Sequence, residues 1–292
     1  MHKFLRTIGF SQYTRKKEIE QLISDFAKNR ENIRTLRIDE DTTLSEIRVE
    51  TSPGMGIAVV GELDTEDMFH VEYYFPYVES TIETSNADCS IQRHTEKETY
   101  AGLLDEYKVG ISLIYYLENM MDYRQRELDH QQWKTNGVCL GGLAVKGKIL
   151  LPVQKTKKQI AMAKVASKDR STLLEAAKNG DEDAMETLTI EDIDLYSRIS
   201  RRLMKEDVYS IIDTCFMPCG IECDQYAVIG DIQKIDKLVN QFTKEEIYDL
   251  MLECNDLMFH VVINQRDLLG EPKVGRRFKG QIWMQGTAKF ES

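Results

Sequence analysis

The stretch "VCLGGLAVKGKILLPV" (residues 138–153) is the strongest indication of the fold class. Valine, leucine and isoleucine dominate it, as is typical of β-strands, and Gly147 stands where a hairpin turn would fall. An earlier stretch, "GIAVVGEL" (56–63), resembles residues 142–149, because glycine, alanine and valine coincide and isoleucine exchanges with leucine. We therefore predict two strands around a turn at Gly147, and related β-structure in both halves of the chain.

Two further pairs of segments recur in the same order along the chain. "EDMFHVEYYFP" (66–76) resembles "EDVYSIIDTCFMP" (206–218), since each has an acidic pair, a strand-like run and a proline. "LLDEYKVG" (103–110) resembles "LLGEPKVG" (268–275), with six of eight residues identical. Order and similarity together favour a tandem duplication of one β-rich module. Chance is the alternative, because short strands rich in glycine, valine and leucine often resemble each other.

The predicted fold class is α+β, with two related and mainly antiparallel β modules. The N-terminal module covers residues 1–130 and the C-terminal module covers residues 131–292. Strong helix formers without proline fill residues 155–205, which we predict to be a helical insertion in the second module. Apolar residues at helical spacing predict two more helices, at 14–29 and 243–256. The remaining predicted strands cover residues 45–50, 68–78, 208–217, 223–232, 258–265 and 278–290, with two more around a turn in 99–119. A helix is the alternative for the second half of 99–119.

The composition limits the partners that the protein can have. The chain has 292 residues and a formal net charge of −11. Such acidity repels phosphate backbones, so we expect no nucleic-acid partner. No apolar run approaches the roughly 20 residues that span a bilayer, and the start "MHKFLRTIGFSQYTRKK" (1–17) lacks the pattern of a secretory signal. We therefore expect a cytoplasmic protein with no membrane partner, whose six cysteines are reduced thiols.

Three of the six cysteines lie at even intervals in "TCFMPCGIECDQY" (214–226). Cys215, Cys219 and Cys223 would line one face of a helix, but the intervening proline and glycine exclude a helix there. In a strand, successive thiols of this set lie roughly 13 Å apart, which is too far for one metal ion. We interpret them as packing side chains and predict no metal or cofactor, with a reactive thiol as the alternative. Only a tight turn at the proline, bringing Cys215 next to Cys223, would restore a metal site.

The segment "GEPKVGRRFKGQIW" (270–283) gathers cations and aromatic side chains. Arginine forks bind carboxylates and phosphates, so the segment predicts a site for a small anionic ligand or a partner protein. A solvated hairpin is the alternative, or a patch that pairs with the acidic stretch 181–194. The candidate binding residues are Lys273, Arg276, Arg277, Lys279 and Trp283.

No catalytic signature accompanies these features. The sequence contains no nucleophile elbow, phosphate-binding loop, dinucleotide-binding glycine motif or zinc-protease motif. The leading hypothesis is a non-catalytic binding or regulatory protein that contacts its partner through segment 270–283. One alternative is an enzyme with an active site between the two modules, and another is a thiol-based redox sensor.

Four longer motifs carry a resemblance to a known family. They are "MHKFLRTIGFS" (1–11), "LTIEDIDLYSRISRR" (188–202), "FMPCGIECDQYAVIGDI" (216–232) and "LLGEPKVGRRFKGQIW" (268–283). Together they resemble a family of uncharacterised bacterial proteins, domain of unknown function 3881, over nearly the whole chain. The resemblance implies a cytoplasmic bacterial protein. It implies no activity, cofactor or site residue.

Overall fold

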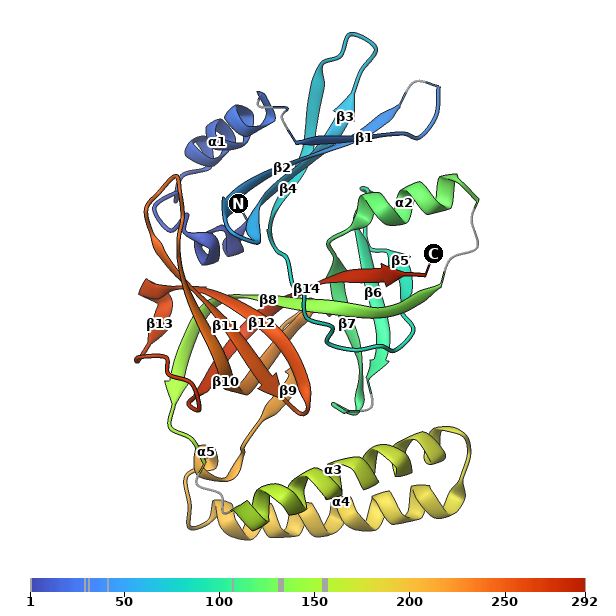
Figure 1. Ribbon diagram of the computed structural model, residues 1–292, viewed down its shortest axis with the longest axis vertical. Coiled ribbons are helices and arrows are strands. Elements are labelled where there is room, and N and C mark those ends of the chain that lie inside the picture. The colour runs from blue at the N-terminus through green and yellow to red at the C-terminus, as the bar shows by residue number, and fades with distance from the viewer. Residues whose placement is uncertain are drawn as a thin grey trace.

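The computed structural model arranges the chain in two β-sheets with helices beside them (Figure 1). The fold class is α+β, as predicted. The structure describes residues 2–28, 30, 32–40, 42–106, 108–130, 134–153 and 157–291, without the side chains of residues 157–164, 167, 171, 198 and 203. The helices of the described residues are η1 (Lys3–Ile8), α1 (Lys16–Lys28), α2 (Met120–Leu128), α3 (Lys157–Lys178), α4 (Glu182–Leu203), α5 (Val208–Ile211) and η2 (Gln265–Asp267). The strands are β1 (Ile33–Arg37), β2 (Thr43–Ser52), β3 (Met55–Leu63), β4 (Phe69–Val78), β5 (Ser90–Arg93), β6 (Tyr100–Glu106), β7 (Ile111–Leu117), β8 (Thr135–Leu150), β9 (Cys215–Pro218), β10 (Gln225–Val239), β11 (Glu246–Cys254), β12 (Leu257–Asn264), β13 (Leu268–Leu269) and β14 (Arg277–Phe290).

Strands β1 to β4 form an antiparallel sheet in sequence order. The turn between β2 and β3 contains Gly54 at a φ of +72°, a conformation that favours glycine. Helix α1 buries Ile19, Ile23 and Phe26, whose spacing places them on one face of the helix. The predicted helix at 14–29 and the predicted strands of this sheet are confirmed. Strand β4 lies at the edge of the sheet, and β3 is its strand neighbour in the described pairings.

Strands β8, β12, β11, β10 and β14 form a closed ring within the ten-stranded sheet. Each pairs with the next, and β14 pairs back with β8 along most of its length. The ring encloses apolar side chains, among which Phe259, Val261 and Leu250 have no exposed surface. Figure 1 shows the ring at the lower left, mainly in orange, red and green. Beyond the ring, β14 pairs with β7, which carries β6 and then β5.

The prediction of a hairpin at 138–153 is wrong, because β8 continues straight through Gly147. A Cβ atom at Gly147 would lie 2.4 Å from the ring of Phe278, and one at Gly142 would lie 2.9 Å from Ile282. Both distances are too short for a side chain, so these glycines leave the space that β14 residues fill. Glycine in this stretch therefore marks close packing across the ring and not a turn.

The predicted helix at 243–256 is also wrong, since β11 forms there. Its apolar residues fit either period, because Leu250 and Cys254 are four apart while Leu252 between them is equally buried. Strands β10 and β12 pair with both edges of this segment, and pairing of that kind overrides local helix propensity. Residues 208–217 likewise begin as the short helix α5, and only their last part forms β9.

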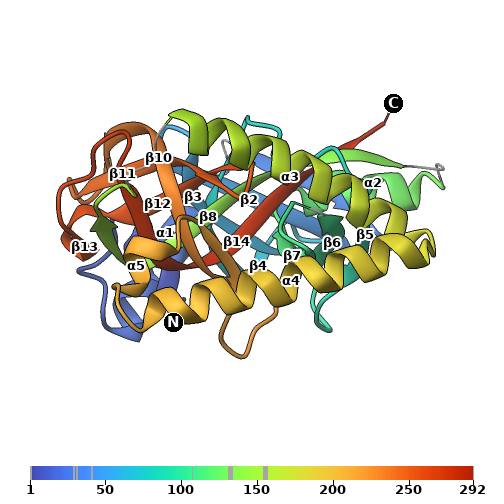
Figure 2. The ribbon, with the colours of Figure 1, turned by 90° about the horizontal axis from the view of Figure 1, so that it is seen from below.

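The helical insertion predicted at 155–205 is confirmed as α3 and α4. Gly180 separates the two helices at a φ of +91°, and the side chain of Asp181 caps the start of α4. Figure 2, seen from below, shows the two helices side by side across the molecule. Lys178 pairs with Asp105 of β6 at 2.6 Å, which attaches the insertion to the ten-stranded sheet.

The internal duplication and the division at residue 130 stay predictions. Strand β3 pairs with β4, whereas the stretch that resembles β3 lies in β8 and pairs with β12, β13 and β14. The stretch that resembles β4 contains α5 and β9, and β9 pairs with β10. In the described pairings, the matched segments thus occupy unlike positions. The ten-stranded sheet also takes strands from both sides of residue 130.

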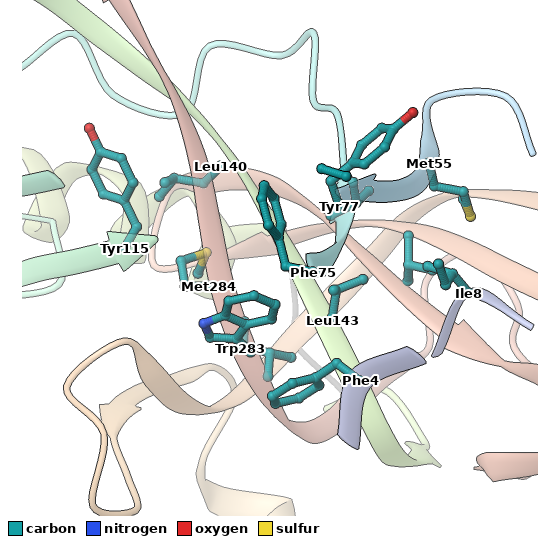
Figure 3. Close-up of a cluster of buried hydrophobic side chains, with 14 of the residues drawn as sticks. Phe4, Ile8, Met55, Phe75, Tyr77, Tyr115, Leu140, Leu143, Trp283 and Met284 are labelled. Atoms are coloured by element: carbon teal, nitrogen blue, oxygen red, sulfur yellow. The ribbon is translucent and has the colours of Figure 1, made fainter. Parts of the chain in front are cut away.

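An apolar core joins the two sheets beside η1 (Figure 3). Phe4 of η1 stacks on Trp283 of β14, with ring centroids 5.2 Å apart. Phe75 of β4 and Leu143 of β8 lie next to this pair (Figure 3). The core therefore holds the four-stranded sheet, and with it the edge strand β4, against the ring. None of the described helices is both long and apolar enough to cross a membrane.

Candidate functional site

A groove of about 930 Å³ lies between α1 and β4. Its volume falls within the range of roughly 300–1,000 Å³ that is usual for ligand sites. On the α1 side, Ile23 and Ala27 give it an apolar wall. On the opposite side the lining residues are Met68, Phe69, Val71, Glu72, Tyr73 and Tyr74.

The groove lies beside the face of the sheet that α1 covers and reaches the open edge of β4. Side chains of a strand alternate between two faces, so a cavity over one face contacts every second residue. Here residues 68–69 and 71–74 contribute to the lining on both sides of a β-bulge at Glu72, where the alternation of faces shifts. Glu72 has no partner residue on β3, and its carbonyl accepts a hydrogen bond from Nζ of Lys97 at 2.9 Å. The edge therefore presents a backbone acceptor that β3 does not use.

Apolar exposure and charge distinguish the end of the groove where β4 begins. Met68 is 57% exposed and Val71 is 42% exposed, so two large apolar side chains face solvent there. Arg30 donates to Asp67 at 3.1 Å, which places the C-terminal end of α1 beside the start of β4. Lys28 lines the same end, and 69% of its side chain is exposed. This end thus combines apolar surface with a solvated cation.

Aromatic side chains connect the groove to the ten-stranded sheet. The Tyr73 hydroxyl donates to the carbonyl of Glu98, which precedes β6, at 2.5 Å, and burial raises the pKa of Tyr73 and of Tyr116 in β7. His2 packs against Trp283 with ring centroids 4.9 Å apart. Burial lowers the pKa of His2 to about 4, so its ring is neutral at pH 7. The indole N–H of Trp283 donates to Asp224 at 2.7 Å, deeper in the core.

A buried ionic cluster lies where the two sheets meet. Arg48 of β2 bonds Glu46 of the same strand at 3.0 Å, and it bonds Glu118, which follows β7, at 2.9 Å. The two carboxylate side chains are 1% and 2% exposed, so one guanidinium serves two desolvated acids. Burial raises the pKa of Glu118 to about 7, although Arg48 opposes the shift. Both carboxylates are closed to solvent and belong to residues 1–130, so this cluster lies within the predicted N-terminal module. An active site between the modules stays a prediction.

Arg277, predicted to bind an anion, is buried in the protein. Only 3% of this residue is exposed. Its guanidinium donates at 2.6–3.2 Å to backbone carbonyls at the two ends of the helical insertion. The fork therefore ties the insertion to β14 through the same geometry that would hold an anion. The accepting residues are Leu151, Tyr209, Ile212 and Asp213.

The other four candidates of the basic segment do not form one site, because Lys273 and Arg276 share a turn while Lys279 and Trp283 lie elsewhere. Trp283 is 5% exposed and packs in the core, and Lys279 donates to a tyrosine hydroxyl of α5. Lys273 pairs with the Glu271 carboxylate, and Arg276 donates to the Glu271 carbonyl, both at 2.9 Å. Anion binding by this segment stays a prediction, and it rests on the exposed Lys273 and the half-buried Arg276.

The three evenly spaced cysteines do not meet. Cys215 begins β9 opposite Ile229 of β10, while Cys223 lies exposed in the loop between these strands. Burial raises the pKa of the Cys215 and Cys219 thiols, which makes them poorer nucleophiles. Cys254, which the sequence does not group with them, donates to the carbonyl of Cys215 at 3.2 Å. Within the described ranges, no three histidine, cysteine or acidic side chains are grouped as metal ligands would be. The redox-sensor hypothesis stays a prediction, with Cys223 as the exposed thiol.

Sequence reasoning missed the groove. The alternation in residues 68–78 predicts a strand, which is correct, but it does not say which strands lie beside it. One usable signal was the charge of Glu72 between Val71 and Tyr73, because a charged residue within an apolar strand is typical of an edge. The exposure of Met68 and Val71 follows from the edge position and could not be read from residue type.

Comparisons with known proteins identify the family and nothing beyond it. No curated protein and no solved structure matches the chain. The family model described as "Domain of unknown function, E. rectale Gene description (DUF3881)" matches residues 5–286, a span that includes α1, β4 and the five-stranded ring except the end of β14. The resemblance carried by the four motifs is thereby confirmed, and the chain belongs to this family.

Proposed function

We propose that the protein is a non-catalytic binding protein whose ligand occupies the groove between α1 and β4. The observation that carries the proposal is the groove itself, with its volume of about 930 Å³ and its exposed Met68 and Val71. Filling it would remove apolar surface from water, at about 25 cal/mol for each Å² buried. An exposed apolar patch beside a defined groove is typical of a binding site.

The polar residues of the groove restrict the ligand. Lys28 is solvated on the groove wall, and its pairing with Asp25 at 3.0 Å is between exposed side chains. Exposed pairs of this kind contribute little, so Lys28 is available to an anionic group of the ligand. The proposed ligand is therefore apolar with an anionic end. The proposal keeps the anionic ligand expected from the sequence, but its site lies between α1 and β4 and not in segment 270–283.

The environmentally sensitive dye 1-anilinonaphthalene-8-sulfonate combines apolar rings with an anion, and it tests the proposal directly. We expect its fluorescence to rise on adding the folded protein and to fall to near background with Ser24→Trp, which fills the groove from α1. Val71→Glu should have the same effect, because it places a negative charge beside the dye. Far-ultraviolet circular dichroism and thermal melting would check that both variants remain folded.

Val274→Glu is the matched control, because Val274 is an exposed valine on the loop before β14. It adds the same charge to the basic segment 270–283, so it also separates the two candidate sites. Dye binding that survives both groove variants would overturn the proposal. Loss of binding only in Val274→Glu would move the site to the basic segment.

A further inference from the structure

The edge of β4 offers a ligand backbone hydrogen-bonding groups in addition to an apolar surface. A strand inside a sheet has hydrogen-bonding neighbours on both sides, whereas β4 has β3 on one side only in the described pairings. Residues 70–72 are exposed, and residue 69 is half-buried. Unpaired N–H and C=O groups along such an edge form a template for another extended chain.

One side chain of the protein already uses this edge. Lys97 donates to the carbonyl of Glu72, at the point where the register between β3 and β4 shifts. A strand that adds at Glu72 would have to replace the Lys97 side chain as the donor to this carbonyl. Because the groove reaches the edge over the length of residues 68–74, the apolar wall of α1 faces the side chains that such a strand would carry.

We infer that the ligand of the groove is an extended peptide segment of a partner protein, which adds to β4 as a fifth, antiparallel strand. The inference rests on the proposed function, since it names the occupant of the same groove. Backbone hydrogen bonds to β4 supply part of the affinity, and alternate side chains of the peptide enter the groove and contact α1. Antiparallel pairing is the more stable of the two arrangements and matches the other strands of this sheet.

Charge along the groove predicts the direction and sequence of the peptide. Arg30 and Lys28 lie at the start of β4, while Glu20 lies about 12 Å away along α1. Glu72 lies roughly 13 Å along the strand from Met68. An antiparallel peptide ends beside the start of β4, so its last residues meet Lys28, whereas Arg30 is already paired with Asp67. We expect alternating apolar residues followed by an acidic side chain near the C-terminal end of the bound segment.

The experiment is selection from a phage-displayed library of linear 12-residue peptides on the immobilised full-length protein. The strongest binder is then synthesised with single N-methyl groups along its backbone. Methylation should weaken binding roughly tenfold or more at every second residue, where the amide faces β4, and should have little effect at the residues between. Val71→Glu should abolish binding of the selected peptide, and Val274→Glu should leave it unchanged.

Four results would overturn the inference, and they separate it from the proposed function. Dye binding in the groove without any enriched peptide would leave the proposed function standing and remove the peptide. An N-methyl pattern with a period of three or four residues would indicate a helical ligand. Peptide binding that Val71→Glu does not affect would place the peptide elsewhere. A wild-type dimer that Val71→Glu converts to a monomer in sedimentation would show that β4 pairs with a second copy of the chain.

Discussion

The five-stranded ring has no open edge along its closure, whereas the four-stranded sheet leaves the edge of β4 open. In the ring, β14 returns to β8, so each of the five strands has a neighbour on both sides. In the four-stranded sheet, β4 is left at the edge, and the groove reaches it. Closure of a sheet removes its edges, whereas an open sheet must cover them or use them. In the proposed function, the ring provides stability and the open sheet provides the binding surface.

Side-chain burial follows the same division in part, because Val239 at the end of β10 in the ring is also 50% exposed. Phe259 and Val261 of the ring have no exposed surface, whereas Met68 and Val71 at the open edge are about half exposed. Residue type is similar in the two places, so the difference arises from strand position. A surface that keeps apolar side chains in water without a partner carries a cost, and binding a partner is the usual reason for it.

Removal of a ring side chain gives the largest expected effect. Phe259→Ala should lower the free energy of unfolding by about 3–5 kcal/mol, because it leaves a cavity inside the closed ring. Phe69→Ala, at the half-buried start of β4, should cost about 1 kcal/mol. Urea unfolding followed by circular dichroism measures both. Equal losses in the two variants would remove the distinction between a stabilising ring and an open binding sheet.

The sequence predicts most strands of the open sheet but not the closure of the ring. Local alternation and a turn at Gly54 are enough to indicate β2, β3 and β4. Closure depends on which residues approach across space, and Gly147 shows the difficulty, because glycine at a turn and glycine under Phe278 look alike in a sequence. The segment of β11 fits a helix equally well until β10 and β12 pair with it.

The sequence predicts the type of interaction that the candidate residues make but not the groups with which they make it. An arginine fork binds carboxylates, phosphates and carbonyls by the same geometry, so the chemistry of Arg277 was correct while its partners were not. Those partners come from residues 64–126 positions away in the chain. The groove escaped prediction because edge position is a property of the assembled sheet. Segment 270–283 has the composition of a surface site, yet Trp283 completes the core between the two sheets.

The buried ionic cluster of Arg48, Glu46 and Glu118, where the two sheets meet, predicts an effect of pH on stability that is intermediate in size. Glu118 has an ordinary pKa of 4.5, and burial raises it to about 7 in the folded protein. The folded state therefore holds the proton more tightly than the unfolded state does. The contribution of Glu118 to stability is fully present below about pH 4.5 and is lost as the pH rises through about 7, with a size of about 2 kcal/mol between pH 5 and 8.

Glu118→Gln removes this titration while keeping an acceptor for Arg48. We expect the stability of the wild type relative to the variant to fall by that amount from pH 5 to pH 8, as measured by urea unfolding at both values. Glu79→Gln is the matched control, because Glu79 contacts the same arginine at 3.4 Å with 52% of its side chain exposed. The expectation fails if Glu118→Gln and Glu79→Gln show the same pH dependence. In that case the junction would not be a desolvated link between the two sheets.

The smallest effect on stability should come from the open edge itself. Val71→Glu places a charge on a side chain that is already 42% exposed, so the free energy of unfolding should change by about 0.5 kcal/mol or less. The melting temperature should stay within about 3 °C of the wild type, measured by circular dichroism. Val71→Glu is also expected to abolish ligand binding. Loss of binding with little loss of stability would show that the open edge of β4 serves binding and not the fold. A melting temperature lowered as far as that of Phe259→Ala would instead mean that Val71 supports the fold, and the open edge of β4 would then be part of the stabilising core.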